Sequence, residues 1–196
     1  MCSIFGIFGL QPGDDIQALR RQSLDCSQRQ RHRGPDWSGV YIDEGGASEG
    51  AILVHERLAI VDPAGGSQPL LSEDRGLALA VNGEIYNHKQ LKAELTQAYA
   101  FQTESDCEVI NALYLEDAPA SFLNRLNGIF AFALWDAGKG RAIIARDPLG
   151  VCPLYWGHDK EGRLRVASEM KSLVDDCADV AQFPPGHWYD TATGEL

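Results

Sequence analysis

Two pairs of apolar segments, each joined by a short turn-forming stretch, constrain the fold of this chain more than any other feature. In the first pair, GIFAFALWD and RAIIARD flank AGKG, and in the second, PLYWG and RLRVAS flank HDKEG. Apolar segments of this length on either side of a glycine-containing turn are typical of β-hairpins. A chain with two such hairpins is expected to build largely antiparallel sheets.

The rest of the chain adds further short strand patterns and a few helix patterns, which together predict an α+β fold. The expected strands are residues 3–10, 39–42, 51–55, 58–61, 76–82 and 187–190. The expected helices are residues 15–31, 88–95 and 106–115, with a short helix from residue 169. No repeat or linker divides the chain, so residues 1–196 are expected to form a single domain.

Charge and composition exclude several classes of partner. The formal net charge of −11 disfavours nucleic acid and anionic membranes, because both require a basic surface. No apolar stretch is long enough to span a bilayer, and the first residues do not resemble a signal peptide, so a cytoplasmic location is expected. The five cysteines are widely spaced and odd in number, which predicts neither a disulfide framework nor a metal site.

A cysteine stands directly behind the initiator methionine. A free thiol with a pKa of about 8.5 is only partly ionised at neutral pH and needs a base to act as a nucleophile. If Met1 is removed, the α-amine of Cys2 becomes such a base on the same residue. The alternative is that Cys2 is a small apolar residue at the start of a buried strand.

Eight motifs in order carry a resemblance to a known family. They are MCSIFGIFG, RHRGPDWSG, HERLAIVD, VNGEIYN, SDCEVI, LNGIFAFALWD, ARDPLG followed by CPLYW, and SEMKSL. Together they resemble the class II glutamine amidotransferases, whose nucleophile is N-terminal. The nearest resemblance is to the glutaminase domain of glutamine-hydrolysing asparagine synthetase. The resemblance covers the whole chain and implies a four-layer αββα sandwich of two antiparallel sheets.

The resemblance also implies a role for particular residues. Cys2 is the implied nucleophile, with its own α-amine as general base and acid. The side-chain amide of Asn82 and the backbone N–H of Gly83 form the implied oxyanion hole. The implied glutamine-binding residues are Arg57, Ile60, Val61, Glu84 and Asp106.

These residue types suit the chemistry. Glutamine is a zwitterion, so an arginine fork complements its carboxylate and acidic side chains complement its ammonium. Each residue also has a simpler interpretation. Arg57 can be a surface charge at a strand edge, the Asn-Gly pair at 82–83 a hairpin turn, and Asp106 a helix cap. Arg33 and Asp36 either brace a loop beside the pocket or form a turn with its own ion pair.

The resemblance implies no cofactor for hydrolysis of glutamine to glutamate and ammonia. ATP and Mg²⁺ belong to a separate synthetase domain, whose phosphate-binding loop does not occur in this sequence. The implied partners are therefore glutamine and a synthetase domain or subunit that receives ammonia to make asparagine from aspartate. Two alternatives remain open. One is an amidotransferase domain that serves another acceptor, and the other is a non-catalytic glutamine-binding or interaction module on the same fold.

Overall fold

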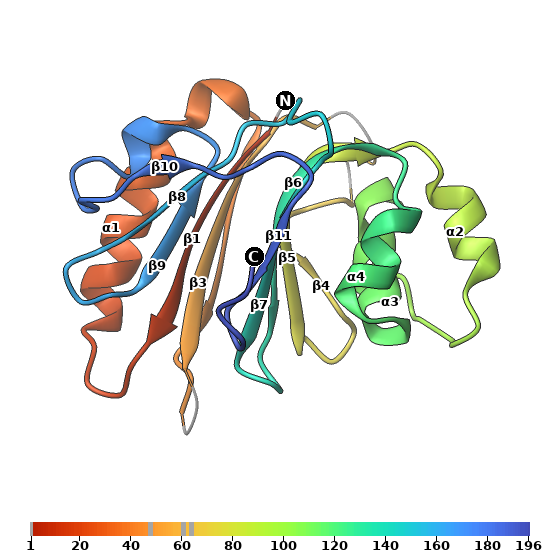
Figure 1. Cartoon of the computed structure of the whole chain (residues 1–196), viewed down its shortest axis with the longest axis horizontal. Coiled ribbons are helices and arrows are strands. Elements are labelled where there is room, and N and C mark those ends of the chain that lie inside the picture. The colour runs from red at the N-terminus through yellow and green to blue at the C-terminus, as the bar shows by residue number, and fades with distance from the viewer. Residues whose placement is uncertain (1, 47–48, 60–61, 63–64) are drawn as a thin grey trace.

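The computed structural model describes residues 2–46, 49–59, 62 and 65–196. Two antiparallel sheets lie face to face, and helices cover their outer faces (Figure 1). The six-stranded sheet has the order β10-β8-β9-β1-β3-β2, and the five-stranded sheet has the order β11-β7-β6-β5-β4. This is the α+β class expected from the sequence patterns and the four-layer sandwich implied by the family resemblance.

The strands of the six-stranded sheet are β1 (Ser3–Leu10), β2 (Trp37–Asp43), β3 (Gly50–Arg57), β8 (Tyr155–His158), β9 (Leu164–Ala167) and β10 (Ala181–Gln182). Those of the five-stranded sheet are β4 (Leu70–Leu71), β5 (Leu77–Ile85), β6 (Gly128–Asp136), β7 (Arg141–Arg146) and β11 (Trp188–Asp190). Both predicted hairpins are present, because β6 pairs with β7 and β8 pairs with β9.

The α-helices are α1 (Ile16–Gln28), α2 (His88–Glu94), α3 (Val109–Glu116) and α4 (Pro119–Phe122). Short 3₁₀ turns are η1 (Arg31–Arg33), η2 (Asp106–Glu108), η3 (Leu123–Arg125) and η4 (Met170–Ser172). Asp15 caps α1, where its Oδ1 accepts from the Ala18 amide at 2.9 Å. The helix then ends earlier than predicted because the side chain of Gln30 turns inward to the Ile4 carbonyl and the Glu169 amide.

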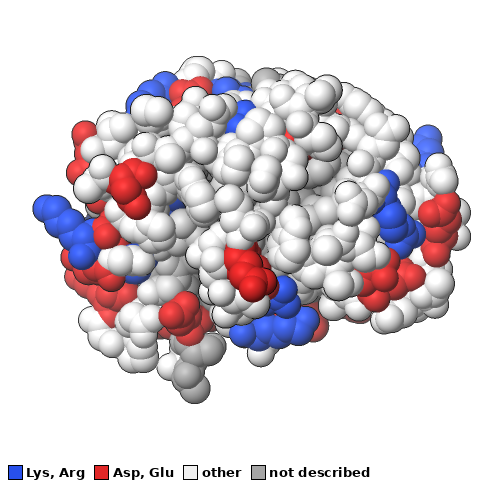
Figure 2. Space-filling view, viewed as in Figure 1, with Lys and Arg blue, Asp and Glu red and all other residues white. Residues whose placement is uncertain are grey.

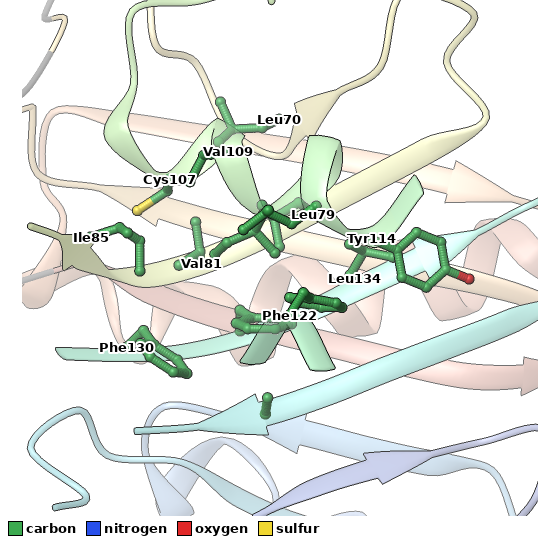
Figure 3. Close-up of a cluster of buried hydrophobic side chains, with 14 of the residues drawn as sticks. Leu70, Leu79, Val81, Ile85, Cys107, Val109, Tyr114, Phe122, Phe130 and Leu134 are labelled. Atoms are coloured by element: carbon green, nitrogen blue, oxygen red, sulfur yellow. The ribbon is translucent and has the colours of Figure 1, made fainter. Parts of the chain in front are cut away.

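Alternation along β1 explains the layers. Ile4 and Phe8 pack between the two sheets, whereas Phe5 and Ile7 point to the other face and pack with α1. Successive strand residues face opposite sides, so a strand that is apolar on both faces requires cover on both. A third cluster packs α2, α3 and α4 onto the five-stranded sheet, with Phe122 among its buried members (Figure 3).

The strand expected at residues 58–61 is wrong where the structure can test it. β3 ends at Arg57, and Leu58 and Ala59 belong to no strand. Their amides are bonded to side chains instead, Leu58 N to the Cys2 sulfur and Ala59 N to the Asp36 carboxylate. Backbone donors satisfied in this way cannot join a strand ladder. Residues 60 and 61 lie outside the described residues.

The Asn-Gly pair at 82–83 is not a hairpin turn. It lies inside β5, where Asn82 is opposite Ala131 and Gly83 is opposite Phe130 of β6. The helix expected at 106–115 begins as η2 and continues as α3. Four short elements of the described chain have no counterpart among the predicted ones: β4, β10, α4 and η3.

The two sheets are also joined by a buried histidine. His55 of β3 is fully buried, and its Nε2 lies 2.9 Å from the Val81 carbonyl of β5 in the facing sheet. Because a carbonyl oxygen can only accept, Nε2 carries the proton of the neutral imidazole ring and donates it to Val81. Burial lowers the pKa of His55 from 6.5 to about 4, because the charged ring loses its hydration.

This histidine makes unfolding sensitive to acid. In the unfolded chain His55 ionises near pH 6.5, and in the folded chain at about pH 4. Between these values the unfolded state binds more protons, so the unfolding free energy decreases as pH falls, by about 3 kcal/mol across the window. We expect His55→Gln, which keeps an amide donor but does not titrate, to flatten the pH dependence by that amount in denaturant unfolding.

The matched control is His187→Gln, which replaces an exposed histidine and should leave the pH dependence as in the parent. Parallel stability profiles for His55→Gln and the parent between pH 7 and pH 4 would contradict the assignment of a neutral, buried His55.

Surface charge is distributed rather than gathered on the face shown in Figure 2. Lysine and arginine side chains there are interspersed with aspartate and glutamate. Arg125 is an example in the described chain, since it pairs with Asp117 at 2.9 Å and with Glu94 at 3.5 Å. In the part of the chain that the structure describes, no helix is long and apolar enough to cross a membrane.

Candidate active site

One pocket collects the residues singled out from the sequence. Of those residues, it is lined by Cys2, Arg57, Asn82, Gly83, Glu84 and Asp106. The remaining two, Ile60 and Val61, lie outside the described residues. The described candidates therefore meet in one place, although they are spread over more than half of the sequence.

The sheet topology explains this meeting. β1 and β3 are antiparallel neighbours, so the start of the chain lies beside the end of β3, and Cys2 comes close to Arg57. β5 contributes from the facing sheet. Its last residue is tied to η2, because the Ile85 amide donates to Asp106 Oδ2 at 2.6 Å. The start of β1, the end of β3 and the end of β5 therefore border the pocket, and the three strands belong to the packed sheets.

The thiol of Cys2 is held by the backbone of one residue, Leu58. The Leu58 amide donates to Sγ at 3.3 Å, and Sγ lies 3.6 Å from the Leu58 carbonyl, to which its own proton can be donated. Burial raises the pKa of Cys2, while the Leu58 amide and the positive charge of Arg57 oppose that rise. The thiol is therefore protonated at neutral pH, and nucleophilic attack requires a base.

Asn82 is the most unusual residue of the pocket. Its side chain is fully buried, and neither Nδ2 nor Oδ1 has a hydrogen-bond partner among the described residues. A buried amide without partners costs free energy, so such a group is rare unless a ligand supplies the partner. Asn82 therefore presents an unused N–H donor beside the thiol of Cys2.

Gly83 is required by close packing and not by a turn. A Cβ at this position would lie 2.2 Å from the Ile129 carbonyl oxygen of β6. Any side chain here would push β5 away from β6 and move the pocket wall. The glycine therefore keeps the backbone of β5 in place at the point where it passes the pocket.

Arg57 is buried to about the same degree as the core, with 5% of its surface exposed. Its Nη2 donates to the Asp62 carbonyl, and Gly66 packs against the same nitrogen, since a Cβ there would lie 2.9 Å from it. Arg57 is therefore not a surface charge at a strand edge. It is a cation fixed in the pocket wall, and a guanidinium in this setting suits a carboxylate.

Two acidic residues face the same pocket. Asp106 is 8% exposed and uses Oδ2 for the Ile85 amide, while Oδ1 makes no hydrogen bond within the described chain. Asp106 does not cap the turn that it begins, because the Ser105 hydroxyl accepts from the Cys107 amide instead. Glu84 lines the pocket with a partly exposed side chain.

The RHRGPD stretch braces the pocket. Arg33 Nε donates to the Cys2 carbonyl at 3.1 Å, and Arg33 Nη1 pairs with Glu169 at 3.3 Å. The Asp36 carboxylate accepts from the Ala59 amide at 2.9 Å and so holds the segment after β3. Of the two interpretations left open by the sequence, the structure supports the brace.

Six residues that line the pocket received no functional role from the sequence: Leu58, Gly66, Gln68, Ser105, Cys107 and Ile129. Gln68 lines it, and its Oε1 accepts from the Val81 amide at 2.9 Å, which ties the loop before β4 to β5. Cys107 also lines it, with its sulfur buried. A loop glutamine and a cysteine after an aspartate carry no distinguishing sequence signal. Within the described ranges, no group of three or more His, Cys, Asp or Glu residues is arranged to hold a metal ion.

Comparison with known proteins places this chain in a family. A family model described as a glutamine amidotransferase domain matches residues 1–184. The chain belongs to the glutamine amidotransferase domain family. The resemblance read from the eight motifs is thereby confirmed.

Two asparagine synthetases are similar to this chain in sequence. Asparagine synthetase B (glutamine-hydrolyzing) of Escherichia coli is 53% identical over 196 residues, which are 100% of this chain and 34% of that protein. Asparagine synthetase (glutamine-hydrolyzing) 2 of rice is 47% identical over 100% of this chain and 32% of its own length. The chain thus spans about a third of the length of these curated relatives.

Solved structures of the family share the architecture. The glutamine phosphoribosylpyrophosphate amidotransferase of B. subtilis superposes with a TM-score of 0.74 at 25% identity, over 96% of this chain and 47% of that one. The pairing of two antiparallel sheets with outer helices is therefore common to this chain and to that amidotransferase.

Proposed function

We propose that this chain hydrolyses the side-chain amide of glutamine through a thioester on Cys2, giving glutamate and ammonia. One observation carries the proposal: a thiol, a buried amide without partners, a fixed guanidinium and two carboxylates line one pocket. This is the set that a zwitterionic amide and its tetrahedral intermediate require. Glutamine amidotransferases as a family supply the reaction class.

The proposed reaction has two halves. The Cys2 sulfur adds to the amide carbon of glutamine, and its proton goes to the base. The carbonyl oxygen becomes an oxyanion, which accepts from Asn82 Nδ2 and from the backbone N–H of Gly83. The base then protonates the leaving nitrogen, the carbon–nitrogen bond breaks, and ammonia departs. Water attacks the resulting thioester by the reverse sequence and releases glutamate.

The proposed base is the α-amine of Cys2, which requires that Met1 be removed. An amine with a pKa of about 7.7–8.0 is partly unprotonated at neutral pH and belongs to the residue whose thiol it must deprotonate. Burial raises the pKa of the Cys2 thiol, and this raises the need for a nearby base. The carbonyl of Cys2 is held by Arg33, so the residue is anchored on the side away from its amine.

The head group of glutamine is bound by charge. Arg57 receives the α-carboxylate, and Asp106 with Glu84 receives the α-ammonium. We include Ile60 and Val61 as pocket residues on the basis of the family resemblance alone. Asp106 has one carboxylate oxygen engaged by the Ile85 amide, which leaves Oδ1 for the substrate.

The ammonia is proposed to serve asparagine synthesis by a synthetase unit that uses ATP and Mg²⁺ in the cytoplasm. Support comes from the names of relatives that are 53% and 47% identical, each of which is about three times as long as this chain. Delivery to a different acceptor has weaker support, since the phosphoribosylpyrophosphate amidotransferase is only 25% identical. A non-catalytic module has no support from the pocket, because each described candidate residue lines it.

The decisive experiment pairs intact mass with activity on the purified chain. We expect a mass that lacks Met1 together with release of glutamate and ammonia from glutamine in equal amounts. Activity in protein whose mass retains Met1 would contradict the α-amine as base. Absence of hydrolysis in protein that has lost Met1 would contradict the proposed function.

Arg57 is expected to govern capture of glutamine more than turnover. Arg57→Ala removes a charge-assisted contact worth roughly 1.5–3 kcal/mol, so kcat/KM should fall by roughly 10- to 150-fold, mainly through KM. Steady-state glutamate release over a glutamine titration measures this. Arg125→Ala, which removes an arginine that pairs with Asp117 and Glu94 outside the pocket, is the control and should keep parental kinetics.

Asp106→Asn distinguishes the ammonium from the carboxylate. This change should weaken the binding of glutamine but not that of glutaramate, the γ-amide that lacks the α-amine, because glutaramate has no ammonium group for Asp106 to bind. If Arg57→Ala lowers kcat alone, or if Asp106→Asn weakens both amides equally, the head-group assignment is wrong.

A further inference from the structure

The pocket contains a second thiol that the proposed chemistry does not use. Cys107 follows Asp106 in η2, is 2% exposed, and lines the same pocket as Cys2. In Figure 3 its sulfur points towards the strand that carries Val81 and Ile85, on the edge of the helix-side core. Cys107 therefore lies where the core of the five-stranded sheet meets the active-site pocket.

Its sulfur is placed between two functional groups. Sγ lies 3.6 Å from Asp106 Oδ2 and 3.6 Å from the Gly83 carbonyl oxygen. A thiol has one proton, so it donates to one of these acceptors at a time. The carboxylate is the stronger acceptor because it is charged, and the thiol proton is therefore directed to Asp106.

The surroundings keep this thiol protonated. Burial raises the pKa of Cys107 well above its ordinary value, and the negative charge of Asp106 raises it further. A permanently protonated thiol is a poor nucleophile but a constant hydrogen-bond donor. Cys107 thus differs in kind from Cys2, although both sulfurs reach one pocket.

Two donors then occupy the same carboxylate oxygen. The Ile85 amide donates to Asp106 Oδ2 at 2.6 Å, and the Cys107 thiol is the second donor to that oxygen. A carboxylate with one oxygen held twice has a fixed plane and cannot exchange its two oxygens by rotation. Asp106 lines the pocket, and its Oδ1 makes no hydrogen bond within the described chain, so Oδ1 is the oxygen that can accept from the α-ammonium in the proposed reaction.

We propose that Cys107 is a positioning residue that fixes the rotamer of Asp106, so that Oδ1 is presented to the α-ammonium of the substrate. The inference rests on the proposed function, since it assigns Asp106 to that ammonium. Cys107 acts through Asp106 and does not touch the reacting atoms. It contributes to discrimination between α-amino amides and amides without the amine.

The test compares two ligands in protein that cannot turn them over. In a Cys2→Ala background, calorimetry gives the dissociation constants of glutamine and of glutaramate for Cys107→Ala, Cys107→Val and Cys107→Ser. We expect Cys107→Ala and Cys107→Val to raise the dissociation constant of glutamine by roughly 3- to 10-fold and to leave that of glutaramate within about 2-fold of the Cys2→Ala protein. Cys107→Ser keeps a hydroxyl donor and should retain most of the affinity for glutamine.

The matched control is Cys26→Ala in the same background. Cys26 is also 2% exposed, and its sulfur also lies 3.6 Å from a carboxylate, Asp176 Oδ2, but it is not part of the pocket. Its replacement should leave both dissociation constants unchanged. Valine at 107 fills the space of the thiol, with one more heavy atom, and has no donor, so a fold defect caused by the cavity in Cys107→Ala does not remove the test.

The outcomes separate the two claims. Equal weakening of glutamine and glutaramate by Cys107→Val means that Cys107 has only a packing role, and this overturns the inference. Unchanged glutamine binding in both donor-free variants overturns it as well. If the Cys2→Ala protein binds no glutamine and the Cys2 protein hydrolyses none, the proposed function itself has failed.

Discussion

Replacing Cys2 with alanine is expected to lower glutamine hydrolysis by at least about 10⁴-fold, to the limit of detection. The thiol is the only protein nucleophile that the proposed reaction uses, and a methyl group cannot form the thioester. The fold should persist, because β1 begins at Ser3 and the thiol is hydrogen-bonded to the backbone of Leu58, which lies beyond the end of β3. Glutamate release and thermal melting measure the two halves of this expectation.

Cys152→Ala is the control for loss of a buried thiol. Cys152 is fully buried between the sheets and does not line the pocket, so its variant should keep turnover and lose some stability. An electrophile shaped like glutamine should label the parent once, at Cys2. Inactivation that follows labelling at Cys107 or Cys152 would contradict the assignment, as would measurable turnover by Cys2→Ala.

Hairpin patterns made much of the strand pairing predictable, whereas the layered sandwich was implied by the family resemblance. The apolar segments around residues 137–140 became β6 and β7, and those around 158–162 became β8 and β9, because a local turn sets which strands pair. The first strand was predicted with its observed bounds, Ser3–Leu10. Its two apolar faces also required cover on both sides, which is the reason for a layered sandwich.

Elements fixed by distant contacts were not predictable. The segment after Arg57 has apolar residues in a strand-like pattern, yet its amides are bonded to Cys2 and Asp36, which are remote in sequence. β4 and β10 have two residues each and exist only because a neighbouring strand is present. Local propensity carries no information about such partners.

The site shows the same division. The residue types at Cys2, Arg57 and Asp106 indicated the chemistry, but only through a family resemblance that supplied their common location. The structure added what no motif contains: the orphaned amide of Asn82 and the thiol of Cys107 beside Asp106. Both depend on which side chains meet across β5 and η2.

The pocket is thus built from groups that the fold leaves unused. Oδ1 of Asp106 makes no hydrogen bond in the described chain, and neither Nδ2 nor Oδ1 of Asn82 makes one. Hydrogen bonds that the protein does not make internally are available to a substrate and its transition state, at a cost in stability. Activity and stability are therefore expected to respond in opposite directions to a change at Asn82.

Asn82→Ala is expected to lower kcat by roughly 10²–10³-fold with a modest change in KM. Nδ2 has no partner in the resting protein among the described residues, so its donor gains a partner only when the oxyanion forms. The same change should leave the unfolding free energy unchanged or raise it, because a fully buried amide without partners is removed. Steady-state kinetics and denaturant unfolding on one preparation test both expectations.

Asn111→Ala provides the reciprocal control for that experiment. Asn111 is equally buried, but its Nδ2 donates to the Leu70 carbonyl at 3.3 Å and it does not line the pocket. Its replacement strands a buried carbonyl, so it should lower stability by about 1–3 kcal/mol and spare kcat. If Asn82→Ala instead destabilises the fold as Asn111→Ala does, or raises KM while kcat is kept, then the Asn82 amide serves structure or ground-state binding and not the oxyanion.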